Sequence, residues 1–237
     1  MFSSETGASA QETYTTDDFT YTLIDEYSKV QILSYIGSDT DVVIPDRIDN
    51  KKVTSIADSA FREKSITSVV FGQYVESISN QAFYSCQSLN KLDFSKSSVK
   101  TIGNYAFASN KVLESVEFPD SLESIGDNAF IAYPDGSYVE NKLKSVKFGK
   151  GLKTIGNGAF YHNRKLTNIE FTGENLTSIG SNAFQDCDSL TELNLKGNGE
   201  TVIDYGAFCG NDALKKISLA GIKTINNYAF QNCVVLN

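Results

Sequence analysis

The chain has one histidine, four cysteines and no tryptophan among 237 residues. His162 is the only possible imidazole base, so a Ser-His-Asp or Cys-His constellation could form only around it. The cysteines are spread one per repeat and do not form the C-x₂-C pairs of zinc sites. Gly197-Asn198-Gly199 lacks the lysine and the Ser/Thr of a phosphate-binding loop. We therefore predict a protein that is not an enzyme and has no cofactor or metal, although paired glycosidase carboxylates remain an alternative.

Long apolar runs and an excess of basic residues are also missing. No segment approaches the roughly 20 apolar residues of a membrane-spanning helix, and the first residues do not read as an export signal. The net charge is −8, and residues 1–41 contribute −7 of it, with eight acidic residues against Lys29 alone. The rest of the chain, with 20 basic and 21 acidic residues, is almost neutral. This balance argues against nucleic acid as a partner.

The dipeptide Ala-Phe, by contrast, occurs eight times. The spacings between its phenylalanines are 22, 24, 23, 30, 24, 24 and 22 residues. A period near 23 residues is typical of a solenoid, which offers a long surface rather than one enclosed core. The eight phenylalanines are Phe61, Phe83, Phe107, Phe130, Phe160, Phe184, Phe208 and Phe230.

Each repeat contains two further apolar patterns. An isoleucine stands five residues before every one of these phenylalanines. About six residues after Phe comes the pattern L-x-x-[VIL]-x-[FL], whose alternation is typical of a half-buried strand. We expect a right-handed α/β solenoid of about eight repeats, with one parallel sheet built from seven such strands.

The segment around Ala-Phe predicts a compact turn. Asp or Asn usually stands three residues before Phe, where a side-chain oxygen can cap a short α or 3₁₀ helix. The phenylalanine should fill the interior of the coil. Ser or Thr stands six residues before Phe in seven repeats, which predicts a stacked ladder of hydroxyl groups. The cysteines read as buried free thiols, with a disulfide between neighbouring coils as the alternative.

Two segments carry a resemblance to a known family. Residues 100–107 read KTIGNYAF, and residues 176–190 read LTSIGSNAFQDCDSL. Both are similar to the BspA-like leucine-rich repeats of bacterial surface proteins, and the resemblance covers roughly residues 42–237. It implies a leucine-rich-repeat solenoid, and members of that family look like adhesins or host-matrix-binding proteins. The family often has proline after the strand, which here holds only at Pro45 and Pro119.

The pattern divides the chain into three parts. Residues 1–18 are acidic and rich in Ser and Thr, which predicts a flexible leader. Residues 19–41 alternate apolar and polar side chains on either side of a turn, which predicts a β-hairpin that caps the first coil. Residues 42–237 form the solenoid. Its last coil is expected to be uncapped, so that the chain is a monomer or self-associates weakly through it.

Two outward-facing columns of the predicted sheet are the candidate binding surface. Their side chains vary in sign and size, whereas the core columns hardly vary. The insertion 131–141, in the 30-residue repeat, adds a turn with two tyrosines that could anchor a ligand. The predicted site residues are Lys91, Asp93, Glu117, Lys147, Asn168, Glu170, Glu192, Asn194 and Lys216 in the columns and Tyr133, Asp135 and Tyr138 in the insertion.

The function predicted from these features is binding. We expect a secreted or cell-surface adhesion module that recognises a host or cell-surface protein or a glycan. The alternative is a structural spacer that displays another domain.

Overall fold

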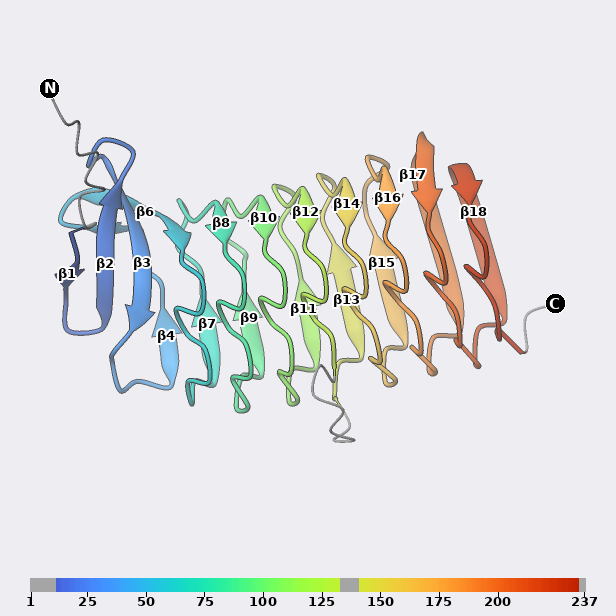
Figure 1. Ribbon diagram of the computed structural model, residues 1–237, viewed down its shortest axis with the longest axis horizontal. Coiled ribbons are helices and arrows are strands. Elements are labelled where there is room, and N and C mark those ends of the chain that lie inside the picture. Colours follow the sequence, from blue (N-terminus) through green and yellow to red (C-terminus); the bar gives the residue numbers. More distant parts are fainter. Residues whose placement is uncertain (1–11, 133–140, 235–237) are drawn as a thin grey trace, which may run out of the picture.

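The protein is an elongated β-solenoid. The computed structural model describes residues 12–132 and 141–234, which form about eight turns with repeats of ~24 residues. Figure 1 shows the coils stacked in chain order along one axis, from the N-terminal strands to β18. The predicted repeat solenoid is thereby confirmed.

The larger sheet has twelve strands. In each coil, the strand of this sheet contains the isoleucine that stands five residues before the phenylalanine of Ala-Phe. Its central strands are only two residues long, and each pairs in parallel with the same segment of the next coil, as Ile102 pairs with Ile125. In Figure 1 these short strands follow one another along the upper side of the molecule. The twelve strands are β1 (Tyr14–Thr15), β2 (Phe19–Ile24), β3 (Lys29–Tyr35), β5 (Arg47–Ile48), β6 (Lys51–Ile56), β8 (Ser77–Ile78), β10 (Thr101–Ile102), β12 (Ser124–Ile125), β14 (Thr154–Ile155), β16 (Ser178–Ile179), β17 (Glu192–Ile203) and β18 (Lys216–Ile225).

The L-x-x-[VIL]-x-[FL] strands form two smaller parallel sheets rather than the single sheet of seven strands that we expected. The last two of these strands are the first halves of β17 and β18, which continue around the coil into the larger sheet. The remaining strands form two separate sheets, because β9 of one coil and β11 of the next are not paired. One sheet is β4 (Asp41–Val43), β7 (Ser68–Val70) and β9 (Lys91–Asp93), and the other is β11 (Ser115–Glu117), β13 (Ser145–Phe148) and β15 (Asn168–Phe171).

The Ala-Phe segments are hydrogen-bonded turns, and the prediction of short α or 3₁₀ helices is wrong for all described residues. In the second coil the N–H groups of Gln81, Phe83 and Ser85 donate to carbonyl groups of the next coil, at 2.8–2.9 Å. Gln81 has φ = 55° and Ser85 has φ = 59°. A helix needs an unbroken run of right-handed residues, and these left-handed residues interrupt it.

The core consists of stacked aromatic rings. The ring centroids of Phe130, Phe160 and Phe184 are separated by 5.1 Å at each step, and the rings are nearly parallel. Phe148, from the neighbouring strand column, meets Phe160 edge to face at 5.7 Å. Phe160 is fully buried, as predicted for a residue inside the coil.

The Asp/Asn column bridges neighbouring coils and does not cap helices as predicted. Oδ1 of Asn80 accepts the backbone N–H of Asn104, and Oδ1 of Asn104 accepts that of Asp127. Glycine precedes three of these six Asp and Asn residues, at Gly103, Gly126 and Gly156, and close packing explains it. A Cβ at Gly103 would lie 2.7 Å from the backbone nitrogen of Asn80, so only glycine allows the coils to approach this closely.

The N-terminal hairpin joins the solenoid by pairing and by stacking. β2 and β3 are antiparallel, and β3 pairs in parallel with β6 of the first coil. The Tyr35 ring stacks on Phe61 at 5.4 Å, and the Tyr35 N–H donates to the carbonyl of Ala60. Part of the predicted flexible leader is ordered, because β1 pairs with β2 and Tyr14 stacks on Tyr21. Residues 1–11 of that leader lie outside the described residues.

Candidate functional site

The structure aligns the two predicted columns on the smaller sheets and on the first parts of β17 and β18. Glu117 of β11 pairs with Lys147 of β13, which pairs with Glu170 of β15. Asn168 lies in the adjacent column, opposite Ser145. Glu117, Lys147, Asn168 and Glu170 line one shallow hollow of about 260 Å³, so four of the predicted residues come together.

The other predicted residues lie further along the solenoid or outside the described part. Glu192 and Asn194 are on β17, and Lys216, on β18, is the register partner of Glu192. Lys91 and Asp93 are on β9, across the break between the two smaller sheets. Tyr133, Asp135 and Tyr138 belong to residues 133–140, which are not described.

A groove of about 780 Å³ opens beside the break between β9 and β11. The aromatic column below it changes geometry at this point: Phe71 and Phe94 stack at 4.4 Å with ring planes 2° apart, whereas Phe94 and Phe118 are 5.8 Å apart and tilted by 38°. The groove lies where the strands end, and the loops that follow form its walls. Its lining includes Asp93, Glu117 and Lys147 from the predicted columns.

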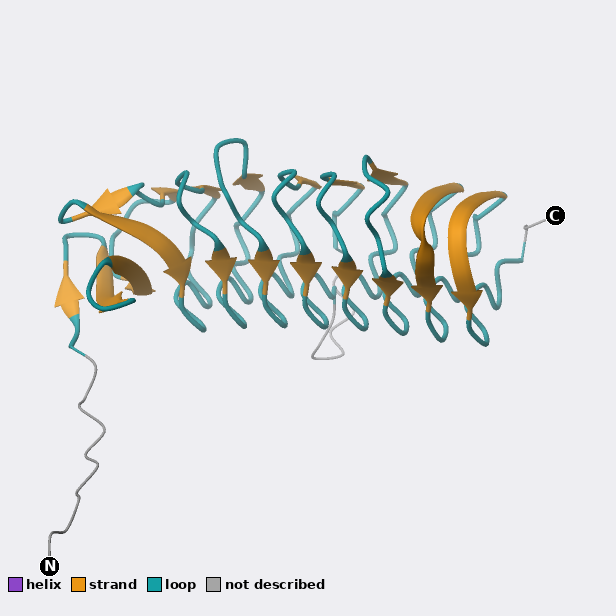
Figure 2. Cartoon of the chain, turned by 90° about the horizontal axis from the view of Figure 1, so that it is seen from above, coloured by secondary structure: helices purple, strands orange, loops and turns teal. Residues whose placement is uncertain are grey.

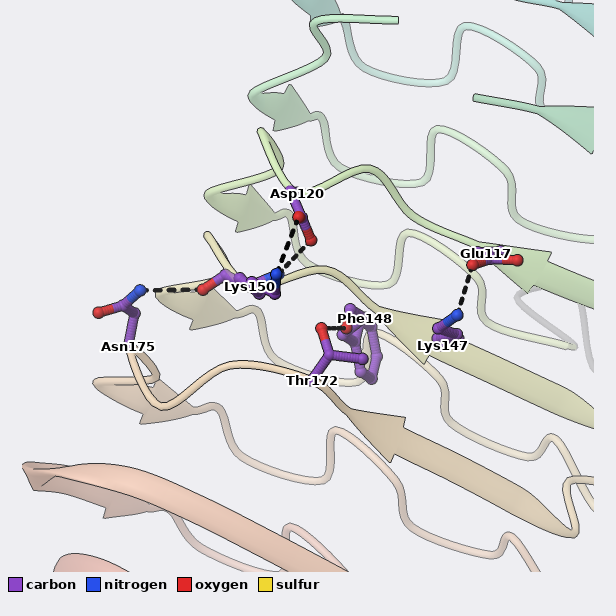
Figure 3. Close-up of polar contacts among 7 residues, drawn as sticks. All are labelled: Glu117, Asp120, Lys147, Phe148, Lys150, Thr172 and Asn175. Carbon is purple, nitrogen blue, oxygen red and sulfur yellow. Dashed lines mark hydrogen bonds and ion pairs between the residues drawn. The ribbon is translucent and has the colours of Figure 1, made fainter. Parts of the chain in front are cut away.

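Two ion pairs stand on the rim of this groove (Figure 3). Lys147 Nζ lies 2.6 Å from Glu117 Oε1, and Lys150 Nζ lies 3.7 Å from Asp120 Oδ2. The backbone N–H of Lys150 also donates to Asp120 Oδ1 at 2.9 Å. The hydrogen bond from Lys147 to Glu117 raises the pKa of the lysine, so Lys147 carries its positive charge near neutral pH.

Asp93 supplies a third carboxylate. It accepts the backbone N–H of Ser95 at 2.9 Å, and hydrogen bonds from Ser95 lower the pKa of the Asp93 carboxyl. The floor beneath it is apolar but closed, since Phe94 is 2 % and Phe118 is 3 % exposed. The groove therefore presents charges and hydroxyl groups to a ligand and no aromatic face.

The far wall is fixed by contacts between successive coils. Thr172 Oγ1 donates to the carbonyl of Phe148 at 2.8 Å, and Asn175 Nδ2 donates to the carbonyl of Lys150 at 2.9 Å (Figure 3). Gly149 allows two successive coils to pack closely in this wall, because a Cβ there would lie 2.3 Å from the carbonyl oxygen of Pro119. The groove is thus preformed by the stacking of the coils.

Sequence reasoning missed the groove residues that follow the strands. Asp120 and Lys150 belong to a set of four acidic and four basic residues that face one another with a constant offset of 30 residues. This offset equals the length of the irregular repeat. The acidic and basic residues spaced by 30 positions could therefore have been recognised in the sequence as ion pairs between neighbouring coils. The four pairs are Glu114–Lys144, Glu117–Lys147, Asp120–Lys150 and Glu123–Lys153.

The single histidine lies apart from this groove. His162 has φ = 62°, its ring stacks on Tyr161 at 3.8 Å, and its Nδ1 lies 3.3 Å from Asp186. Its side chain is 23 % exposed. Burial lowers the pKa of His162. Within residues 12–132 and 141–234 no group of three His, Cys, Asp or Glu side chains could hold a metal ion.

The cysteines have a structural role in the coils. Cys86 and Cys187 are buried, and all four thiols are free. Cys86 Sγ donates to the carbonyl of Phe61, and Asn110, at the same position of the next coil, donates to those of Phe83 and Phe107. Burial raises the pKa of Cys86 to about 12, which leaves the thiol protonated and unreactive.

A family model described as the BspA type leucine rich repeat region (6 copies) matches residues 40–134 and 134–237. The chain belongs to the BspA-type leucine-rich-repeat family. No curated protein matches it. None of the described segments is a helix long and apolar enough to cross a membrane.

Several solved structures are similar to this chain. The leucine rich repeat protein of T. pallidum is 24 % identical, with a TM-score of 0.67 over 95 % of this chain and 91 % of that one. A leucine rich cell surface protein from Faecalibacterium prausnitzii is 21 % identical, with a TM-score of 0.42 over 98 % and 95 % of the two chains. The pneumococcal vaccine antigen PcpA is 18 % identical, with a TM-score of 0.36 over 96 % and 86 %. The first of these supports the fold.

Proposed function

We propose that this chain is a non-catalytic binding module of a secreted or cell-surface bacterial protein, and that its ligand binds in the groove beside β9 and β11. The observation that carries the proposal is the groove itself. It is a preformed hollow of about 780 Å³ on an otherwise shallow face, and it lies over three residues of the variable columns, Asp93, Glu117 and Lys147.

The chemistry of the groove favours a polar ligand that carries both signs of charge. Two lysines and three carboxylates line it, together with Ser95, Ser97 and Ser121. Tight protein interfaces usually bury aromatic anchors, and the aromatic rings here are already covered. An extended segment of an extracellular protein fits this pattern, and the contact is expected to be weak and strengthened by multivalency. A glycan is the alternative ligand.

Family membership supports the location outside the cell. The similar structures include a cell surface protein and a vaccine antigen. We carry this location to the present chain as part of the proposal.

The proposal can be tested with a charge swap that keeps the ion pair. We expect the double variant Glu117→Lys/Lys147→Glu to keep its stability, because exposed pairs contribute only about 0–1 kcal/mol. Its binding to immobilised matrix proteins or to a glycan array should fall, because both charges on the rim are reversed. The control is Glu200→Lys/Lys223→Glu, which swaps another exposed ion pair, between β17 and β18 and away from the groove.

The insertion provides a second arm of the same experiment. Ala132 is part of the solenoid, since its N–H donates to the carbonyl of Tyr161, so the excision should begin at residue 133. Removing residues 133–139 should change the stability by less than about 1 kcal/mol, because loop length costs little. Affinity should fall if the insertion contacts the ligand. Unchanged binding in both the excision and the groove variant would reject this surface and favour the spacer function.

A further inference from the structure

A column of hydroxyl groups runs along the outer side of the twelve-stranded sheet, away from the groove. One Ser or Thr precedes the buried isoleucine in each of six successive coils. The short strands that carry these residues lie side by side along the solenoid (Figure 2), about 4.8 Å apart as in any sheet. The column is Ser55, Ser77, Thr101, Ser124, Thr154 and Ser178.

These six hydroxyl groups have no hydrogen-bond partner among the described residues. Ser55 is 7 % exposed, and its Oγ is buried without a partner. Other hydroxyl side chains do bond to the protein: Thr177 Oγ1, next to the column, donates to the carbonyl of Lys153 at 2.8 Å. The other five residues of the column are half-buried or exposed, so their hydroxyl groups can bond to a partner that comes from outside the chain.

The column lines two hollows of about 440 Å³ each. The first contains Ser55, Ser77 and Thr101, and its other walls include Lys29 and Gln31 of the hairpin. The second contains Ser124, Thr154 and Ser178. The six hydroxyl groups span roughly 24 Å, which is five steps of the strand spacing. We call this column, with the hollows beside it, the track.

Glycine and Asx side chains complete the second hollow. Its lining includes Gly126 and Gly156, where a Cβ would meet the backbone nitrogen of Asn104 or Asp127 in the preceding coil. The lining also includes Asn104 and Asn157, whose Oδ1 atoms accept backbone N–H groups of the following coils. Their Nδ2 groups have no partner within the described part of the chain, so two coils offer an amide group beside the hydroxyl groups of the second hollow.

We propose that this track binds a linear, uncharged polysaccharide that lies along the solenoid axis. Ser, Thr and Asn side chains both donate and accept hydrogen bonds, as sugar hydroxyls do. The same set recurs in successive coils, and a ligand whose own groups repeat can use all of them. The surface is distinct from the groove of the proposed function and involves other residues.

The charges beside the track favour an uncharged ligand. Lys100 pairs with Glu76 at 2.9 Å, and Lys153 pairs with Glu123 at 2.7 Å. Because these cations are paired, the track has no excess of positive charge to select an acidic polymer. A peptide would need an exposed strand edge for backbone pairing, whereas the backbone groups of these central strands are already paired within the sheet.

The test uses defined oligosaccharides and a variant without the hydroxyl groups. The probes are linear β-1,4-glucan, β-1,3-glucan and β-1,4-mannan chains, from disaccharides to octasaccharides, measured by microarray and isothermal titration calorimetry. At least one series should bind, with affinity that rises with chain length. In Ser124→Ala/Thr154→Val/Ser178→Ala the affinity should fall at least about tenfold, because three hydrogen bonds of ~1 kcal/mol are lost.

The matched control is Ser115→Ala/Ser145→Ala, which removes hydroxyl groups from the other sheet and should bind as the parent does.

The melting temperature of the triple variant should equal that of the parent, since the three hydroxyl groups that it lacks bond to no protein group. A marked fall would overturn the inference. It is also overturned if none of the three series binds, if affinity is independent of chain length, or if the control and not the triple variant loses binding. Loss of binding in the groove charge swap alone would assign the sugar to the groove instead.

Discussion

At the scale of single residues, the fold depends on positions that repeat the same contact in every coil. The phenylalanine of Ala-Phe is the largest of these, and its ring has an aromatic neighbour on both sides from Phe83 to Phe208. Three residues later, Asn or Cys donates to Phe carbonyl groups: Asn163 Nδ2 bonds those of Phe130 and Phe160, both at 2.9 Å. The variation between Asn and Cys has one physical reason, because both can donate to a carbonyl that would otherwise be buried without a partner.

Replacement of Phe160 by Ala should therefore be costly. The ring is fully buried between two others, and its removal leaves a cavity between coils that cannot collapse. We expect a loss of about 3–5 kcal/mol in the free energy of unfolding, measured by urea denaturation. Tyr205→Ala serves as a control, because Tyr205 is 50 % exposed. A loss below about 1 kcal/mol for Phe160→Ala would contradict this description of the core.

At the scale of elements, the turns and the N-terminal hairpin determine how coils meet. The turns use left-handed residues two before and two after Phe, which point their N–H groups at the next coil. Four of the eight residues two before Phe are Asn or Gly, namely Asn128, Gly158, Asn182 and Gly206. These types adopt positive φ readily, so the sequence contained a signal against a helix.

The hairpin should matter far more to stability than the residues before it. Deleting residues 1–16 removes β1 and the stacking of Tyr14 on Tyr21, and we expect only a small decrease in melting temperature. Deleting residues 1–41 uncovers Phe61 and the edge of β6, because Tyr35 and β3 are lost. That variant should aggregate, which scanning fluorimetry and light scattering would detect. Equal behaviour of the two truncations would be incompatible with a capping role for β2 and β3.

At the scale of the whole molecule, the solenoid separates two surfaces of different chemistry. One holds the charged groove near β9 and β11, and the other holds the hydroxyl track. Neither exists within one repeat, because the walls of both come from successive coils. Exposed hydrophobic side chains gather instead near the last coil: Ile225 is 49 %, Tyr228 53 % and Val234 72 % exposed.

These residues lead us to expect weak, concentration-dependent self-association of this chain. β18 is the last strand of the twelve-stranded sheet, and an exposed strand edge beside apolar side chains favours pairing with another chain. Sedimentation velocity should show the mean mass rising with concentration. The variant Ile225→Lys/Tyr228→Lys should reduce this rise, while Lys223→Ser, on the same strand, should not. A constant monomer mass at every concentration would reject the expectation.

The sequence by itself determined the repeat, its length and the residues of the core. A period of Ile, Ala-Phe and L-x-x-[VIL]-x-[FL] allows only coils that stack like on like, because each copy must bury the same apolar edge against the next. It also determined which side chains face outward, so that Glu117, Lys147 and Glu170 were expected in one column and are register partners.

Only the tertiary structure decided where that column becomes a groove. The break between β9 and β11, the tilt of Phe118 against Phe94 and the close approach of Gly149 to Pro119 depend on how particular coils pack. The bonds of Asn80 and Asn104 to the following coils are likewise invisible in a local pattern, which resembles that of a helix cap. Periodicity specifies which residues stack, whereas the offset between two stacked coils is set by the contacts of both.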